Sequence, residues 1–88
     1  MKALQVTCPR LFEVKDIPRP QLPADGEARV LVRTRWVSMC GSDIPFFAGS
    51  KRYRSYPLAP GAPIHECVGE VVESTSQKFR PGEMVLSI

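Results

Sequence analysis

Residues 28–49 read ARVLVRTRWVSMCGSDIPFFAG, and within them the pattern of the chain changes from that of a strand to that of a helix. As far as Trp36, neutral or apolar side chains alternate with mostly basic ones, which is the period of a strand with two different faces. One face carries Val30, Val32, Thr34 and Trp36, and the other carries Arg29, Leu31, Arg33 and Arg35. The sequence therefore predicts a half-buried strand that leads to Cys40.

A short helix is predicted directly after this strand. Ser42 is a suitable N-cap, and Pro45 is tolerated in a first turn because the N–H that it lacks would be unpaired there. Gly49 suits the end of the helix, so we expect helical residues at 43–48. Cys40 then lies where the strand meets the helix N-terminus, a setting in which amide dipoles favour a thiolate.

A β-hairpin is predicted at the start of the chain. Residues 2–7 and 12–17 alternate in the manner of strands, and Cys8-Pro9-Arg10 suits the turn between them. Residues 18–26 contain three prolines, each without a ladder donor, so this segment is expected to be a loop within one domain.

The second half of the chain also alternates in short runs. Residues 50–64 are rich in Pro and Gly and predict an irregular loop, whereas residues 67–74 predict a strand in which Gly69 permits a close backbone approach or a bulge. Pro81-Gly82 suits a type II turn before another strand from Met84. Together these elements predict a mostly β fold, a small antiparallel barrel or sandwich with one short helix.

Composition argues against several classes of partner. Twelve basic and nine acidic residues leave a net charge of +3, too small to indicate a polyanion. Lys51-Arg52-Tyr53-Arg54 is a basic and aromatic cluster, but so short a run is typical of a solvated loop, so no nucleic-acid partner is predicted. No apolar run is long enough for a membrane span, and the first residues lack the apolar core of a secretory signal.

Cysteine and histidine usage suggests chemistry at the centre of the chain. Cys40 and His65, the sole histidine, are the side-chain types that suit zinc best. The three cysteines, at positions 8, 40 and 67, are widely spaced and form no Cys-x-x-Cys pair, so we expect neither a closed structural zinc site nor a disulfide framework. This cysteine usage favours a cytoplasmic setting. The residues alone leave open a plainer alternative, a buried cysteine and an ordinary loop histidine.

Several short motifs favour the zinc reading because of their order. They resemble the amino-terminal GroES-like domain of the zinc-dependent medium-chain alcohol dehydrogenases, and they cover almost the whole chain. The motifs are VSMCGSDI at 37–44, YPL at 56–58, HE at 65–66, VGEVVE at 68–73 and FRPGE at 79–83. The resemblance implies a GroES-like irregular antiparallel β-barrel with one short helix. Residues 1–88 would be the amino-terminal portion of this domain, and the cofactor-binding domain would lie outside them.

The resemblance also implies a role for each matching residue. Cys40 and His65 would be zinc ligands, and Glu66 would be a carboxylate that can approach the metal. Ser42 and Asp43 would be the catalytic residues, one relaying the proton of the alcohol and the other orienting His65. Plainer readings are a helix cap for Ser42, a favourable charge at the helix N-terminus for Asp43, and an exposed first strand residue for Glu66.

One position departs from the family pattern. The family commonly has glycine directly before the His-Glu pair, and Ile64 stands there in this sequence. A β-branched residue disfavours a positive φ, so we expect the backbone that enters His65 to differ from that of the family or to be strained.

The activity implied is oxidation of an alcohol to a carbonyl compound with hydride transfer to NAD or NADP, by a homo-oligomeric parent enzyme acting on small molecules. The 88 residues contain no Gly-x-Gly-x-x-Gly fingerprint, so no cofactor-binding residue is assigned and the isolated chain is expected to be inactive. The alternative is a non-catalytic GroES-like assembly barrel without metal. Cys40 with Ser42, and His65 with Glu66, argue against it, because an assembly module does not need them.

Overall fold

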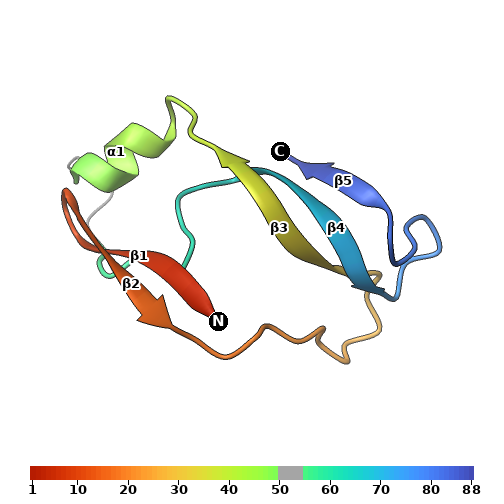
Figure 1. Ribbon diagram of the computed structural model, residues 1–88. Coiled ribbons are helices and arrows are strands. Elements are labelled where there is room, and N and C mark those ends of the chain that lie inside the picture. The colour runs from red at the N-terminus through yellow and green to blue at the C-terminus, as the bar shows by residue number, and fades with distance from the viewer. Residues whose placement is uncertain (50–54) are drawn as a thin grey trace. The chain divides into compact units, whose positions relative to one another are not determined.

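The computed structural model describes residues 1–49 and 55–88, so the basic cluster Lys51-Arg52-Tyr53-Arg54 lies outside the described residues. Its elements, in chain order, are β1 (Lys2–Cys8), β2 (Leu11–Asp16), β3 (Val30–Ser38), α1 (Asp43–Ala48), β4 (Glu66–Ser74) and β5 (Met84–Ser87) (Figure 1). The chain divides into two compact units. Met1–Pro18 and Ser38–His65 make the first, and Arg19–Val37 and Glu66–Ile88 make the second.

The first unit begins with the predicted hairpin. β1 and β2 pair antiparallel, with Leu4 opposite Val14 and Val6 opposite Phe12, and the register shifts between Val6 and Cys8. These four side chains alternate with outward ones along both strands, so they share one face of the hairpin. The prediction of two strands and a turn at the start of the chain is confirmed.

Helix α1 has the predicted bounds and ends where glycine is needed. Gly49 has φ 76° and ψ 49°, a left-handed conformation, and its N–H donates to the Pro45 carbonyl at 3.1 Å. A Cβ at Gly49 would lie 2.5 Å from both Cβ and Cγ of Pro9 in the hairpin turn. The helix end therefore packs closely on the turn of the hairpin, as Figure 1 also shows.

The segment that leads to His65 is irregular, as predicted, and it follows the edge of β1. Leu58 N–H donates to the Val6 carbonyl at 2.9 Å, and Gly61 N–H donates to the Leu4 carbonyl at 2.8 Å. The Gln5 side-chain amide donates to the Leu58 carbonyl at 2.9 Å. These bonds satisfy part of the open edge of β1 and hold the segment in place.

The second unit is a three-stranded sheet in the order β3-β4-β5. β4 and β5 pair antiparallel with Gly69 opposite Val85, and the arrows of β3 and β4 also run in opposite directions in Figure 1. Val71 on β4 is completely buried. The prediction for β3 is only partly right, because half-burial is limited to residues 30–32 and Trp36 is 68% exposed.

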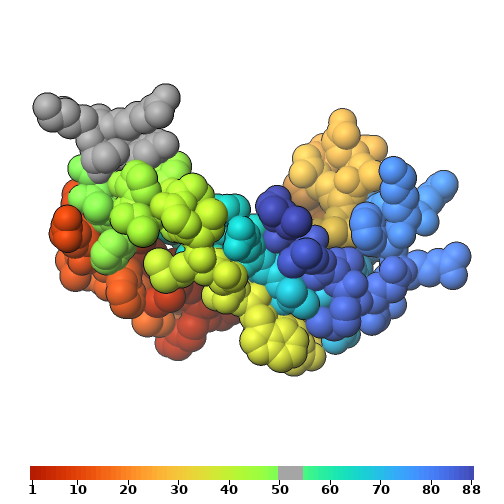
Figure 2. All heavy atoms as spheres, turned by 90° about the horizontal axis from the view of Figure 1, so that it is seen from above, coloured from red at the N-terminus to blue at the C-terminus, as the bar shows by residue number. Residues whose placement is uncertain are grey.

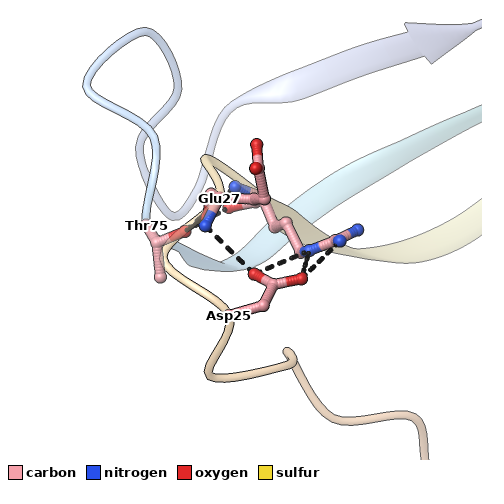
Figure 3. Close-up of polar contacts among 4 residues, drawn as sticks. Asp25, Glu27 and Thr75 are labelled. Atoms are coloured by element: carbon pink, nitrogen blue, oxygen red, sulfur yellow. Dashed lines mark hydrogen bonds and ion pairs between the residues drawn. The ribbon is translucent and has the colours of Figure 1, made fainter.

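Polar contacts around Asp25 join the loop before β3 to Thr75, the residue that follows β4 (Figure 3). Its carboxylate accepts the Glu27 N–H at 3.0 Å and pairs with Arg29 Nε at 3.0 Å, and this guanidinium lowers the pKa of Asp25. Arg29 N–H donates to Thr75 Oγ1 at 2.9 Å, and Thr75 N–H donates to the Arg29 carbonyl at 2.8 Å. Residues 19–29 and the start of the β4–β5 connection are accordingly neighbours in Figures 1 and 2.

The turn before β5 is the predicted type II turn. Gly82 has φ 96°, which a type II turn requires at its third residue, and Glu83 N–H donates to the Arg80 carbonyl at 3.2 Å. Val71 bonds to both sides of this turn, because its N–H donates to the Glu83 carbonyl and its carbonyl accepts the Gly82 N–H.

The fold class is confirmed as mostly β, with antiparallel sheets and one short helix. In the part of the chain that the structure describes, the strands form one two-stranded and one three-stranded sheet, so the closed barrel stays a prediction. None of the helices in residues 1–49 and 55–88 has the length and apolar character that crossing a membrane requires.

Gly69 provides a test of the packing of β3 on β4. A Cβ on this buried residue would overlap Val32 Cγ1 and lie 2.5 Å from the backbone oxygen of Arg33, which cannot move aside without distorting β3. We expect Gly69→Ala to reduce the free energy of unfolding by about 1–3 kcal/mol in chemical denaturation. Gly41→Ala is the control, because no atom lies within 4 Å of the Cβ it would add. Equal stability of the two variants would contradict the close approach.

Candidate functional site

Cys40 lies in a tight turn that links β3 to α1. Asp43 N–H donates to the Cys40 carbonyl at 3.0 Å, and Ile44 N–H is 3.4 Å from the Gly41 carbonyl oxygen. Cys40 is half-buried, whereas Gly41 and Ser42 are exposed. The change from strand to helix that the sequence predicted thus places the thiol at a turn, with its side chain partly open to the outside.

Asp43 is the polar centre of this turn. Its side chain is only 2% exposed, and Oδ2 accepts the backbone N–H of Cys40 at 2.8 Å. The other oxygen, Oδ1, lies 3.1 Å from Nδ1 of His65. Burial of a carboxylate is costly unless hydrogen bonds and charges compensate it. One buried carboxylate therefore contacts the backbone of Cys40 and the ring of His65.

The surroundings of His65 assign its ring proton. Nδ1 lies 3.1 Å from the Pro63 carbonyl oxygen as well as 3.1 Å from Asp43 Oδ1. Both neighbours are acceptors, so the neutral ring carries its proton on Nδ1 and has its lone pair on Nε2. The side chain is 42% exposed, so part of the ring faces the outside.

The thiol and the imidazole lie close enough to share an ion. Cys40 Sγ and a ring nitrogen of His65, both in the first unit, are within 4.8 Å of each other. Ser42 Oγ lies 3.3 Å from Cys40 Sγ. This part of the predicted site is therefore brought together by the turn, α1 and the segment before β4.

The capping role expected for the Ser42 side chain is wrong. Ser42 occupies the N-cap position, but its side chain makes no capping hydrogen bond. Its φ of −70° and ψ of −14° are helical, whereas a side chain that caps a helix comes from an extended residue. The Ser42 hydroxyl lies 3.3 Å from Cys40 Sγ instead.

Glu66 is placed differently from the other predicted residues. It is half-buried, it is the first residue of β4, and it belongs to the second unit. A single peptide bond joins it to His65, so covalent geometry alone limits how far its carboxylate can be from the imidazole.

The departure from the family at Ile64 is accommodated without strain. Among the described residues, Arg10 is the only non-glycine residue with a positive φ, and the left-handed residue of this segment is Gly61, with φ 87°. Ile64 lines an open, apolar cavity of about 400 Å³ in the first unit. The backbone that enters His65 thus needs no positive φ at Ile64, and its side chain forms part of the wall of this cavity.

Sequence reasoning missed two groups that contact the residues or elements of the site. The Pro63 carbonyl contacts His65 Nδ1, but a backbone oxygen has no signal in a sequence. The Tyr56 hydroxyl donates to the Phe46 carbonyl of α1. The only available signal was the YPL motif, which indicates an aromatic residue at this position but not its partner.

The charges around His65 predict a measurable change in its titration. The Pro63 carbonyl raises the pKa of His65 most, and the Asp43 carboxylate and Cys40 raise it further against a lowering by burial. We expect an imidazole pKa above 6.5 in wild type, a smaller increase in Asp43→Asn, and no change in the exposed control Glu13→Gln. NMR titration of the metal-free chain measures this.

The raised pKa of His65 also predicts how the stability of the fold changes with pH. Because the folded chain binds the His65 proton more tightly than the unfolded chain, its contribution is complete below pH 6.5 and is lost as pH rises through the higher folded pKa. A pKa in Asp43→Asn equal to that of wild type would contradict the contact between Asp43 and His65.

Comparison with known proteins finds relatives for most of the chain. The family model of the alcohol dehydrogenase GroES-like domain matches residues 26–88. An uncharacterised zinc-type alcohol dehydrogenase-like protein of Haemophilus influenzae is 34% identical over 98% of this chain and 24% of its own length. A glucose 1-dehydrogenase of Metallosphaera sedula is 34% identical over the whole chain and 24% of its own length.

Further relatives have other substrates in their names. A probable mannitol dehydrogenase of Fragaria ananassa is 39% identical over 68% of this chain and 16% of its own length. No solved structure matches the chain significantly. The chain spans about a quarter of the length of the first curated relatives it matches. The match over residues 26–88 shows that this chain belongs to the alcohol dehydrogenase GroES-like domain family, a family of oxidoreductases.

Proposed function

We propose that residues 1–88 are the amino-terminal part of the catalytic domain of a zinc-dependent oxidoreductase. The full-length protein would oxidise a small alcohol to a carbonyl compound with hydride transfer to NAD or NADP. The observation that carries this proposal is the contact of one buried carboxylate, that of Asp43, with both the Cys40 backbone and the His65 ring. An assembly module without metal gains nothing from such an arrangement.

The donor set fits zinc. A thiolate and a neutral imidazole are its preferred protein ligands, and the Nδ1 proton leaves Nε2 of His65 available. Cys40 and His65 would hold the ion, Glu66 would be a further carboxylate near it, and the third ligand of a catalytic zinc would lie outside residues 1–88. When bound, zinc supplies a Lewis acid that lowers the pKa of an alcohol.

Two residues of this chain would support the chemistry. The Ser42 hydroxyl, 3.3 Å from Cys40 Sγ, is a neutral donor and acceptor that can take the proton of an alcohol and pass it on. Asp43 would fix the tautomer and the orientation of His65 without touching substrate. Two of the relatives are named for glucose and for mannitol, so we propose a small hydroxylated molecule as the substrate class.

Metal content tests the ligands directly. In the full-length protein we expect Cys40→Ser and His65→Ala each to lose one equivalent of zinc, because a catalytic site with one protein ligand fewer is too weak to retain the ion through purification. Cys67→Ser is the control, since this thiol lies on β4 and is not assigned as a ligand. Elemental analysis of the purified proteins measures the stoichiometry. Equal zinc in all four proteins would reject the assignment and favour a metal-free assembly role.

Turnover tests the role of Ser42. In the full-length protein, Ser42→Ala should lower the turnover number by about 10²-fold and Ser42→Thr should retain most of it, because general acid–base steps contribute about that much. Since the side chain makes no capping bond, neither variant should change the melting temperature appreciably. Steady-state kinetics and thermal melts are the measurements. Wild-type residues 1–88 alone should show no turnover, and full activity in Ser42→Ala would exclude the relay.

A further inference from the structure

We propose that Tyr56 is a positioning residue for the Cys40–His65 pair. Its phenol hydroxyl donates to the Phe46 carbonyl and so joins α1 to the segment that carries His65. The inference rests on the proposed function in that the pair is taken to hold a metal. The geometric part concerns only residues of the first unit and can be tested without metal.

Helix α1 is too short to be held by its own hydrogen bonds. It has six residues, and helices of this length are not stable in isolation. The carbonyls of its last turn need donors from elsewhere. The Pro45 carbonyl accepts the Gly49 N–H at 3.1 Å, the Phe47 carbonyl accepts the Arg10 N–H at 2.7 Å, and the Phe46 carbonyl accepts the Tyr56 hydroxyl.

These donors differ in where they come from. Gly49 directly follows α1, and Arg10 belongs to the hairpin turn, so neither bond connects the helix to the segment that ends at His65. Tyr56 lies on that segment, which is itself bonded to β1 through Leu58 and Gly61. The Tyr56 bond is also the only one of the three that a point substitution can remove without changing the backbone.

The hydrogen bond of Tyr56 does not contact Cys40 or His65 itself, and its effect on them is transmitted through α1. Asp43 is the first residue of α1, and its two oxygens contact the Cys40 amide and His65 Nδ1. Tyr56 thus fixes one end of α1 to the segment, and Asp43 contacts the same segment at the other end. If the first contact is lost, α1 can shift along the segment, and both contacts of Asp43 lengthen together.

The test replaces Tyr56 with Phe, which removes one oxygen and keeps the half-buried ring. In the metal-free chain we expect hydrogen exchange of the Cys40 amide to become roughly 3- to 10-fold faster, the change that one net hydrogen bond supports. The Val71 amide, which donates to Glu83 in the second unit, is the internal reference and should be unchanged.

The second readout is a titration of the metal-free full-length protein with Co²⁺, followed by its thiolate absorption bands. The dissociation constant of Tyr56→Phe should rise by roughly 3- to 10-fold relative to wild type. Gln5→Met is the matched control, because it removes another side-chain hydrogen bond to the same segment, that to the Leu58 carbonyl, without touching α1. In Gln5→Met, the exchange rate of the Cys40 amide and the dissociation constant for Co²⁺ should both be closer to the wild-type values than in Tyr56→Phe.

The outcomes separate the two proposals. Unchanged exchange of the Cys40 amide in Tyr56→Phe overturns the positioning role, as does an equal effect in Gln5→Met or an equal acceleration at Val71, each of which indicates general loosening. If wild type shows no thiolate bands with Co²⁺ while Tyr56→Phe still accelerates exchange at Cys40, the metal proposal fails and the positioning role of Tyr56 stands.

Discussion

The buried carboxylate of Asp43 is the constraint on which the first unit depends. A charge that is 98% removed from solvent must be compensated, and its partners are a backbone N–H at 2.8 Å and an imidazole nitrogen at 3.1 Å. These partners come from positions 40 and 65, twenty-five residues apart in the sequence. Both of these contacts exist only when the turn before α1 and the segment before β4 are in place, so the position of Asp43 depends on both parts of this unit.

β1 provides the scaffold on which these parts meet. One edge pairs with β2, and backbone groups of Leu4 and Val6 bond to residues 58 and 61 of the segment that ends at His65. The turn of the hairpin also bonds to the end of α1 through Arg10. The short helix α1 is therefore held from two sides, by the hairpin turn and by the segment that ends at His65. Both of these are connected to β1. The second unit is stabilised separately, by the pairing of its three strands and by the contacts around Asp25.

The arrangement explains why the site does not need a paired ligand motif. In a structural zinc module, neighbouring cysteines bring most of the ligands together through local geometry. Here the thiol and the imidazole are each presented by irregular backbone, at a strand-to-helix turn and at the end of a loop, and tertiary contacts bring them within 4.8 Å. The imidazole of His65 stays 42% exposed in this arrangement, whereas the ligands of a structural zinc site enclose the ion on all sides.

The order of the motifs predicted that Cys40 and His65 lie together, although it is tertiary contacts that bring them within 4.8 Å of each other. Features controlled by neighbouring residues could also be predicted from the sequence: the bounds of α1 from Pro45 and Gly49, the hairpin from its alternation, and the type II turn from Pro81-Gly82. Each depends on φ, ψ or side-chain period, which local chemistry controls. The exposure of Trp36, the contact of Asp43 with His65 and the bond of Tyr56 to Phe46 depend on residues farther away in the chain. Only the tertiary structure could decide them, because the Asp43 carboxylate, the Pro63 carbonyl and the Tyr56 hydroxyl find their partners through the fold of the backbone.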